Sequence, residues 1–210
     1  MVASEQGWLR PLETGGAAVV KKSFILAILL LSLLGCGGVR YSHVAPEAKD
    51  FPFRRIALLP ADVRVFPDAK GTVDQLFAQV LTKKGRFDAV VGADEIMRRM
   101  EMNQDLRDAV EEYLEKLDKL SFSDSELSRQ IGRLTDTEAL LLVRVDYWHY
   151  TQKGDNRLAR VGLGVTLVQA QTGKTLWAAG QDRTSDFLIR RPELANMAEG
   201  VIGELIETMP

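Results

Sequence analysis

Few residues of this chain are of the types that usually carry catalysis or bind metal. There is one cysteine, Cys36, and there are two histidines, His43 and His149, among 210 residues. A nucleophilic serine or cysteine needs a base to activate it, most often histidine, and a Cys/His zinc site needs three or four ligands. One such chain therefore cannot build a disulfide framework or a Cys/His metal site, and we expect neither a metal nor a cofactor.

Two acidic residues near Arg183 are the remaining candidates for hydrolytic chemistry. Asp182 and Asp186 could form a carboxylate site together with His149, which would make the protein a periplasmic hydrolase. The same residues are also consistent with a surface ion pair, the commoner arrangement. The hydrolase alternative requires all three side chains to meet in one cleft, and we expect no enzyme activity.

Two glycine motifs only partly match nucleotide-binding signatures. Gly173-Lys174-Thr175 has the end of a phosphate-binding loop, but Val168 stands where that motif needs its first glycine, and the segment lies between two predicted strands. Gly162-Leu163-Gly164 lacks the third glycine of a dinucleotide site. We expect this second pair to permit close packing or a bulge in a strand.

Residues 20–36 have the pattern of a secretion signal. The basic pair Lys21-Lys22 precedes an apolar run over residues 24–34, as in a signal peptide. The run is too short to span a bilayer, which takes roughly 20 apolar residues. Because residues 1–19 lack this pattern, translation starts at either Met1 or Val20, and we favour Val20.

The segment Leu33-Leu34-Gly35-Cys36 resembles a lipobox, the sequence read by bacterial lipoprotein processing. The resemblance implies that residues 1–35 are removed and that Cys36 is lipidated and becomes the amino terminus. Gly37 follows in place of aspartate, which by the known sorting rule indicates an outer-membrane protein facing the periplasm, although the inner membrane remains an alternative. The bilayer is thus an expected partner, with residues 36–52 as a tether reaching about 20 Å.

Residues 53–210 have the length and patterning of a single α/β (α+β) domain. Apolar periodicity predicts strands at 54–60, 87–91, 137–145, 158–170 and 175–184. It predicts helices at 72–84, 93–102 and 123–134, a further helix whose apolar stripe runs from Leu106 to Leu117, and a last one opened by Pro192. This order predicts one mixed sheet packed by helices. The net charge of −2 gives no basic field for nucleic acid.

Four segments resemble the CsgG-like and LpoB-like bacterial lipoproteins, whose fold is related to the amino-terminal domain of TolB. They are RRIALLP at 54–60, FDAVVGADEI at 87–96, SELSRQIGRLTDTEALLLVRV at 125–145 and VTLVQAQTGKTLWAAGQ at 165–181. The resemblance implies an envelope interaction or assembly module, whose protein partner is another envelope protein or a second copy of the chain. A subunit of a ring-forming secretion complex is the alternative, although no spare membrane-crossing strands are evident.

Three aromatic residues at the end of the predicted strand 137–145 are candidate partner contacts. Tyr147, Trp148 and Tyr150 surround His149 just before a Gly-Asp-Asn turn. Strand alternation puts Trp148 and Tyr150 on the face opposite Tyr147, so one helix layer would leave some aromatic surface exposed. They form either a binding surface or a packing layer against the last helix.

Overall fold

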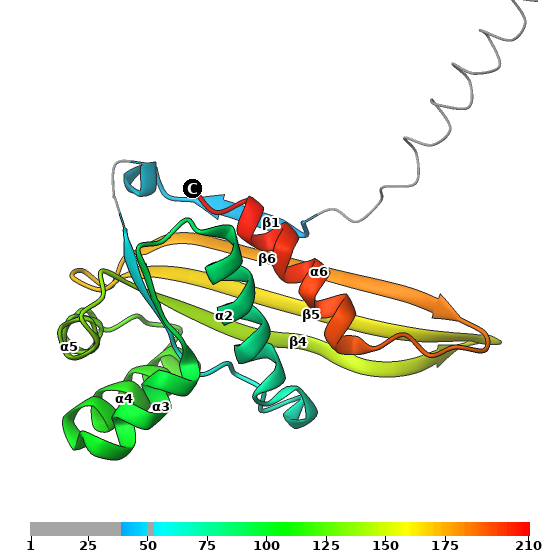
Figure 1. The fold of residues 1–210 in the computed structure, drawn as a ribbon, viewed down its shortest axis with the longest axis horizontal. Helices are drawn as coiled ribbons and strands as arrows, with labels where there is room; N and C mark the ends of the chain where they lie inside the picture. The colour runs from blue at the N-terminus through cyan, green and yellow to red at the C-terminus, as the bar shows by residue number, and fades with distance from the viewer. Residues whose placement is uncertain (1–38, 50–52) are drawn as a thin grey trace, which may run out of the picture. The chain divides into compact units, whose positions relative to one another are not determined.

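A computed structural model of the chain describes residues 39–49 and 53–210 (Figure 1). The signal and lipobox residues, Leu33 to Cys36, lie outside these described residues. No helix within 39–49 or 53–210 is long and apolar enough to span a bilayer.

The described chain forms a single α/β domain around a mixed six-stranded sheet, as expected. The sheet order is β1-β6-β5-β4-β2-β3, in which β2 runs parallel to β3 and β4 and the other neighbours are antiparallel. In chain order the elements are β1 (Tyr41–Val44), η1 (Pro46–Lys49), β2 (Arg55–Leu58), η2 (Pro67–Ala69), α2 (Thr72–Lys84), β3 (Ala89–Val91), α3 (Ala93–Met102), α4 (Gln104–Leu120), α5 (Ser125–Thr135), β4 (Ala139–Lys153), β5 (Asn156–Gln169), β6 (Thr175–Phe187) and α6 (Leu194–Glu207).

Local signals set several element ends. The Asp124 carboxylate accepts hydrogen bonds from the backbone N–H groups of Glu126 and Leu127 and caps α5. The predicted helix over 123–134 therefore begins at Ser125, and Ser123 lies before it and shares a hydrogen bond with the Tyr113 hydroxyl. The predicted turn between β5 and β6 is present, with Gly173 at φ 69°.

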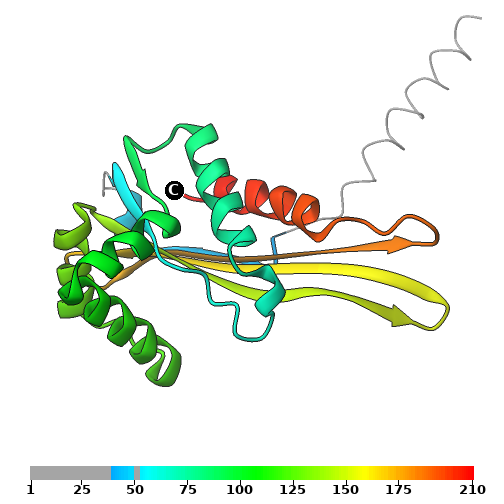
Figure 2. The same cartoon turned by 60° about the horizontal axis from the view of Figure 1, so that its bottom comes forward.

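Two apolar clusters lie on opposite faces of the sheet. Alternate residues of β2 and β4 point to opposite sides, so that Leu58 and Leu141 join one cluster and Ala57 and Leu140 the other. The first side, the α6 face, is covered by α2 and α6. The second, the α4 face, is covered by α4 and α5 with Ile96 of α3. Figure 2 shows these two helix layers from the side.

The long antiparallel strands β4, β5 and β6 extend well beyond the helices of the α4 face (Figures 1 and 2). We call the part of the sheet near β2 and β3 the proximal half, and the part beyond the β-bulge between Val145 and Tyr147 the distal half. The bulge reverses the alternation of β4, so both Val145 and Trp148 point to the α6 face. Among the described residues, α-helices cover the distal half on the α6 face alone (Figure 2).

The structure differs from the sequence interpretation at the start of the domain. Residues 41–49, which we assigned to the tether, form β1 and η1. β1 pairs with β6 from Tyr41 opposite Gly180 to Val44 opposite Trp177. The four residues of β1 are too few and too irregular to show apolar periodicity, so the sequence pattern did not indicate a strand. They form one because they pair with β6, which lies far away in the sequence.

Candidate functional site

A groove of about 670 Å³ opens on the α4 face, where the proximal and distal halves meet. The floor is formed by β4 and β5, including Leu142 and Thr166, and one wall by the last turns of α4 with Leu114 and Leu117. Tyr41 of β1 forms another part of the lining. The volume of the groove falls within the range of about 300–1,000 Å³ that is typical of ligand pockets.

Arg64 holds two carboxylates at the rim of this groove. Its guanidinium donates hydrogen bonds to Asp62, at 2.7 and 2.8 Å, and to Asp118 of α4, at 2.6 Å for the Nη2–Oδ1 pair. These bonds raise the pKa of Arg64 above its usual range and hold the pKa values of Asp62 and Asp118 below theirs. All three groups are therefore charged at neutral pH, and one cation is shared by two anions.

A line of alternating charges continues from the groove into the distal half. Arg144 donates to Asp146 at 2.7 Å, which raises the pKa of Arg144. Arg40 bridges Asp146 and Asp182, and Arg160 donates to Asp182 at 2.9 Å. We call these five residues the charge ladder. They come from the segment before β1 and from β4, β5 and β6, and strand pairing brings them together.

Glycines beneath the charge ladder allow two tyrosines to lie close to the sheet. A Cβ on Gly162 would lie 2.5 Å from Cδ2 of Tyr147, and one on Gly180 would overlap the ring of Tyr41. The Arg160 guanidinium stacks on the Tyr147 ring, with Cζ 3.5 Å from the centroid. Gly162 also pairs with Tyr147 directly beside the bulge, so the expected close packing at this glycine is confirmed.

The other two predicted partner-contact aromatics pack on the α6 face. Trp148 is 9% exposed, within the apolar cluster of that face. Tyr150 donates a hydrogen bond to the Pro192 carbonyl at 2.6 Å and meets Phe187 edge to face. This geometry favours the packing alternative for Trp148 and Tyr150. Tyr147 is half-buried and lies on the opposite face, where it contacts Arg160 of the charge ladder.

The residues of the hydrolase alternative do not meet in a cleft. Asp182 and Asp186 lie four residues apart on β6, roughly 13 Å along the strand. His149 lies on β4, two strands away, where its ring stacks on Phe66 at 5.6 Å. Among residues 39–49 and 53–210, no group of three or more His, Cys, Asp or Glu side chains is arranged to hold a metal ion.

Sequence reasoning missed the groove and most of the ladder. Arg40 and Tyr41 were placed in the tether, and Asp62, Arg64 and Asp118 lie on two segments that meet only in the fold. Glycines two residues apart at 162 and 164, together with Gly180, were the available signal of a sheet face approached by large side chains.

The chain is similar in fold to solved structures of other bacterial proteins. The PelC dodecamer from Paraburkholderia phytofirmans superposes with a TM-score of 0.51 at 17% identity, over 82% of this chain and 96% of that one. A single-residue variant of the same PelC, also a dodecamer, gives a TM-score of 0.50 at 18% identity, over 82% and 97%. Lipoprotein GNA1162 from Neisseria meningitidis gives 0.43 at 12% identity, over 73% and 97%.

This similarity is one of fold. The distant CsgG-like and LpoB-like lipoprotein fold indicated by the sequence segments is confirmed. No protein-family model matches the sequence, and a comparison with curated proteins finds no match.

Proposed function

We propose that the protein is a lipid-anchored envelope lipoprotein whose α/β domain is an assembly module that works by self-association. The fold it shares with PelC, a protein whose solved structure is a dodecamer, is the observation that carries the proposal. The half-covered sheet and the open groove on the α4 face support it, because they leave surface for a second copy of the chain to cover.

The anchor is the second part of the proposal. Cys36 would carry the lipid, since it follows the lipobox residues Leu33, Leu34 and Gly35. Two or more acyl chains give stable attachment where one gives only marginal binding. The domain would then be held at the periplasmic side of the outer membrane, as Gly37 indicates.

Metabolic labelling with a palmitate analogue tests the anchor. Wild type and a Ser42→Ala control should take up the label, whereas Cys36→Ala should lose it and remain unprocessed. Label retained by Cys36→Ala would contradict lipidation at this residue.

Light scattering of the full chain in detergent tests self-association. We expect a mass of several subunits that falls on dilution, and closed rings in negative-stain images would support the ring-forming alternative. A monomer at every concentration would contradict self-association. Crosslinking in intact cells with mass spectrometry would then identify a different envelope partner.

A further inference from the structure

The connection between β6 and α6 exposes an unusual apolar pair. Leu188 is 82% exposed and Ile189 is 98% exposed. The neighbouring Phe187 and Tyr150 pack against the apolar cluster of the α6 face, to which Leu188 and Ile189 do not belong. Adjacent exposed aliphatic side chains favour contact with another surface. We call Leu188 to Arg191 the tip.

Two arginines give the tip a positive charge. Arg191 stacks on Tyr150, with Cζ 3.3 Å from the ring centroid. Within the described part of the chain, Arg190 has no hydrogen bond or ion pair. The tip therefore presents two apolar side chains followed by an unpaired cation.

The groove on the α4 face has complementary chemistry. Leu114, Leu117 and Leu142 are only partly buried there and offer an apolar surface. The charged residues that line the groove are three acids and two arginines, namely Asp62, Glu115, Asp118, Arg64 and Arg144. Glu115 already pairs with Lys119, but Asp62 and Asp118 share the single guanidinium of Arg64, so these two carboxylates can accept a further cation.

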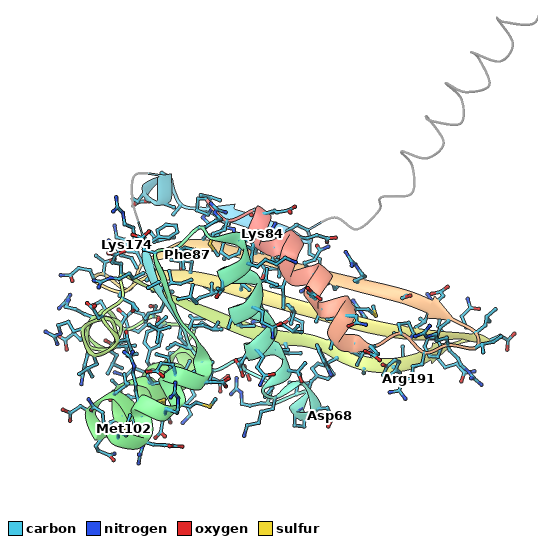
Figure 3. The ribbon with its side chains drawn as sticks, in the orientation of Figure 1. Asp68, Lys84, Phe87, Met102, Lys174 and Arg191 are labelled. Carbon is cyan, nitrogen blue, oxygen red and sulfur yellow. The ribbon has the colours of Figure 1, made fainter. Side chains whose placement is uncertain are left out.

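A tip cannot reach the groove of its own chain. The groove floor at Thr166 pairs with Ala178 of β6, and the tip begins ten residues after Ala178. At about 3.3 Å per residue of strand, the separation is roughly 33 Å. Figure 3 labels Arg191 at one end of the domain and Met102, beside α4, at the other. Contact between tip and groove therefore requires two copies.

We infer that the tip of one copy docks in the α4-face groove of the next copy. Leu188 and Ile189 cover the leucines of the groove, and Arg190 faces Asp118. This inference rests on the proposed self-association and identifies its two surfaces. Because the surfaces differ, the contact is head-to-tail, and repetition gives a closed ring or an open filament.

The charge of this end of the sheet does not by itself select the partner, because Lys153 and Arg157 are exposed there beside Asp155 and Asp186. The groove of a second copy offers carboxylates and apolar side chains together, and this combination favours a second copy as the partner of the tip.

Cysteine crosslinking of the full chain in detergent tests the docking. A chain carrying both Ile189→Cys and Thr166→Cys, treated with a short thiol-reactive crosslinker, should give a ladder of dimers, trimers and larger species. Wild type and each single variant provide the background. Two double variants serve as matched controls. The first combines Ile189→Cys with Thr184→Cys, because Thr184 is a β6 threonine outside the groove. The second combines Thr166→Cys with Met102→Cys, because Met102 is an apolar residue that is 81% exposed elsewhere on the domain.

Removing the apolar pair tests the energetics. Leu188→Ser with Ile189→Ser should weaken self-association roughly tenfold to a hundredfold and leave the melting temperature unchanged, because both side chains are exposed. Met102→Ser should change neither quantity.

Three results would overturn the inference. If the oligomer forms but the crosslinked dimers, trimers and larger species do not appear, and the double serine variant keeps the wild-type dissociation constant, the docking is wrong while self-association stands. If the full chain is monomeric, both proposals fail. If brominated lipid quenches a fluorophore on Ile189→Cys in phosphatidylcholine–phosphatidylglycerol vesicles, the tip contacts lipid instead of a second copy.

Discussion

Strands β4, β5 and β6 run through both the proximal and the distal half of the sheet, but the helices that cover them differ between the two halves. In the proximal half, the consecutive β4 residues Leu140 and Leu141 are both fully buried, because helices cover both faces. In the distal half, Trp148 is buried on the α6 face, whereas His149 on the opposite face is only half-buried and stacks on Phe66 at the start of η2. The helix layers therefore decide which positions of a strand must be apolar.

The comparison also explains where the charges are. The uncovered distal face needs polar side chains, and the charge ladder provides them in mutually paired form. On the α6 face, Arg183 and Gln181 of β6 both pair with Glu204 of α6. Polar residues on the covered face are thus few and paired with a helix.

Replacing one residue on each distal face should give the largest contrast. Trp148→Ala is expected to lower the free energy of unfolding by about 3–5 kcal/mol, because it removes a large buried ring. His149→Ala should change it by less than about 1 kcal/mol. Urea unfolding of both variants measures the difference, and equal losses would show that both distal faces are buried.

A pair of consecutive β4 residues in the proximal half should lose similar free energies of unfolding when each is replaced. Leu140→Ala and Leu141→Ala are each expected to cost about 3 kcal/mol, since each leaves a cavity in a fully buried cluster. Urea unfolding again provides the measurement. A cost confined to one of the two leucines would contradict a proximal half that is covered on both faces.

Two carboxylates should respond to pH in opposite directions, with the smallest effects. Burial raises the pKa of Asp74, whose Oδ1 accepts a hydrogen bond from the Ala61 N–H at 2.9 Å. Folding therefore favours the protonated acid, and stability from this group is lost as the pH rises above its ordinary value of 3.8 through the folded pKa. Asp74→Asn keeps the acceptor, so its melting temperature relative to wild type should rise between pH 3 and pH 7.

Asp118 provides the opposite case on the open side of the sheet. Hydrogen bonds from Arg64 lower its pKa, so its contribution to stability is present at neutral pH and is lost as the pH falls below 3.8 through the folded pKa. The melting temperature of Asp118→Asn relative to wild type should therefore fall between pH 3 and pH 7. Parallel slopes for the two variants would contradict the different environments of these carboxylates.

Local patterns predicted most elements, and non-local pairing explains the failures. The apolar stripe of α4 and the glycine turn at Gly173 depend on residues close in sequence, and both are present. The strand predicted at 137–145 is present as the first part of β4, which continues to Lys153.

The candidate site was much less predictable. Arg40, Asp146 and Asp182 meet only because β1, β4, β5 and β6 pair in one register. The bulge beside Asp146 then decides which face each later residue of β4 occupies. A sequence shows neither register nor bulge directly, and the lipid anchor and membrane location remain predictions.

The position of β1 has a mechanical consequence. Any tension that enters the domain from the residues before 39 reaches the sheet first at this edge strand, through the hydrogen bonds from Arg40 N–H to Gly180 and from Ala45 N–H to Leu176. Antiparallel hydrogen bonds lie perpendicular to the strands, so a pull along β1 loads them together in shear, whereas a sideways pull breaks them one after another. The direction of the pull therefore sets how much force the domain withstands before β1 detaches from β6.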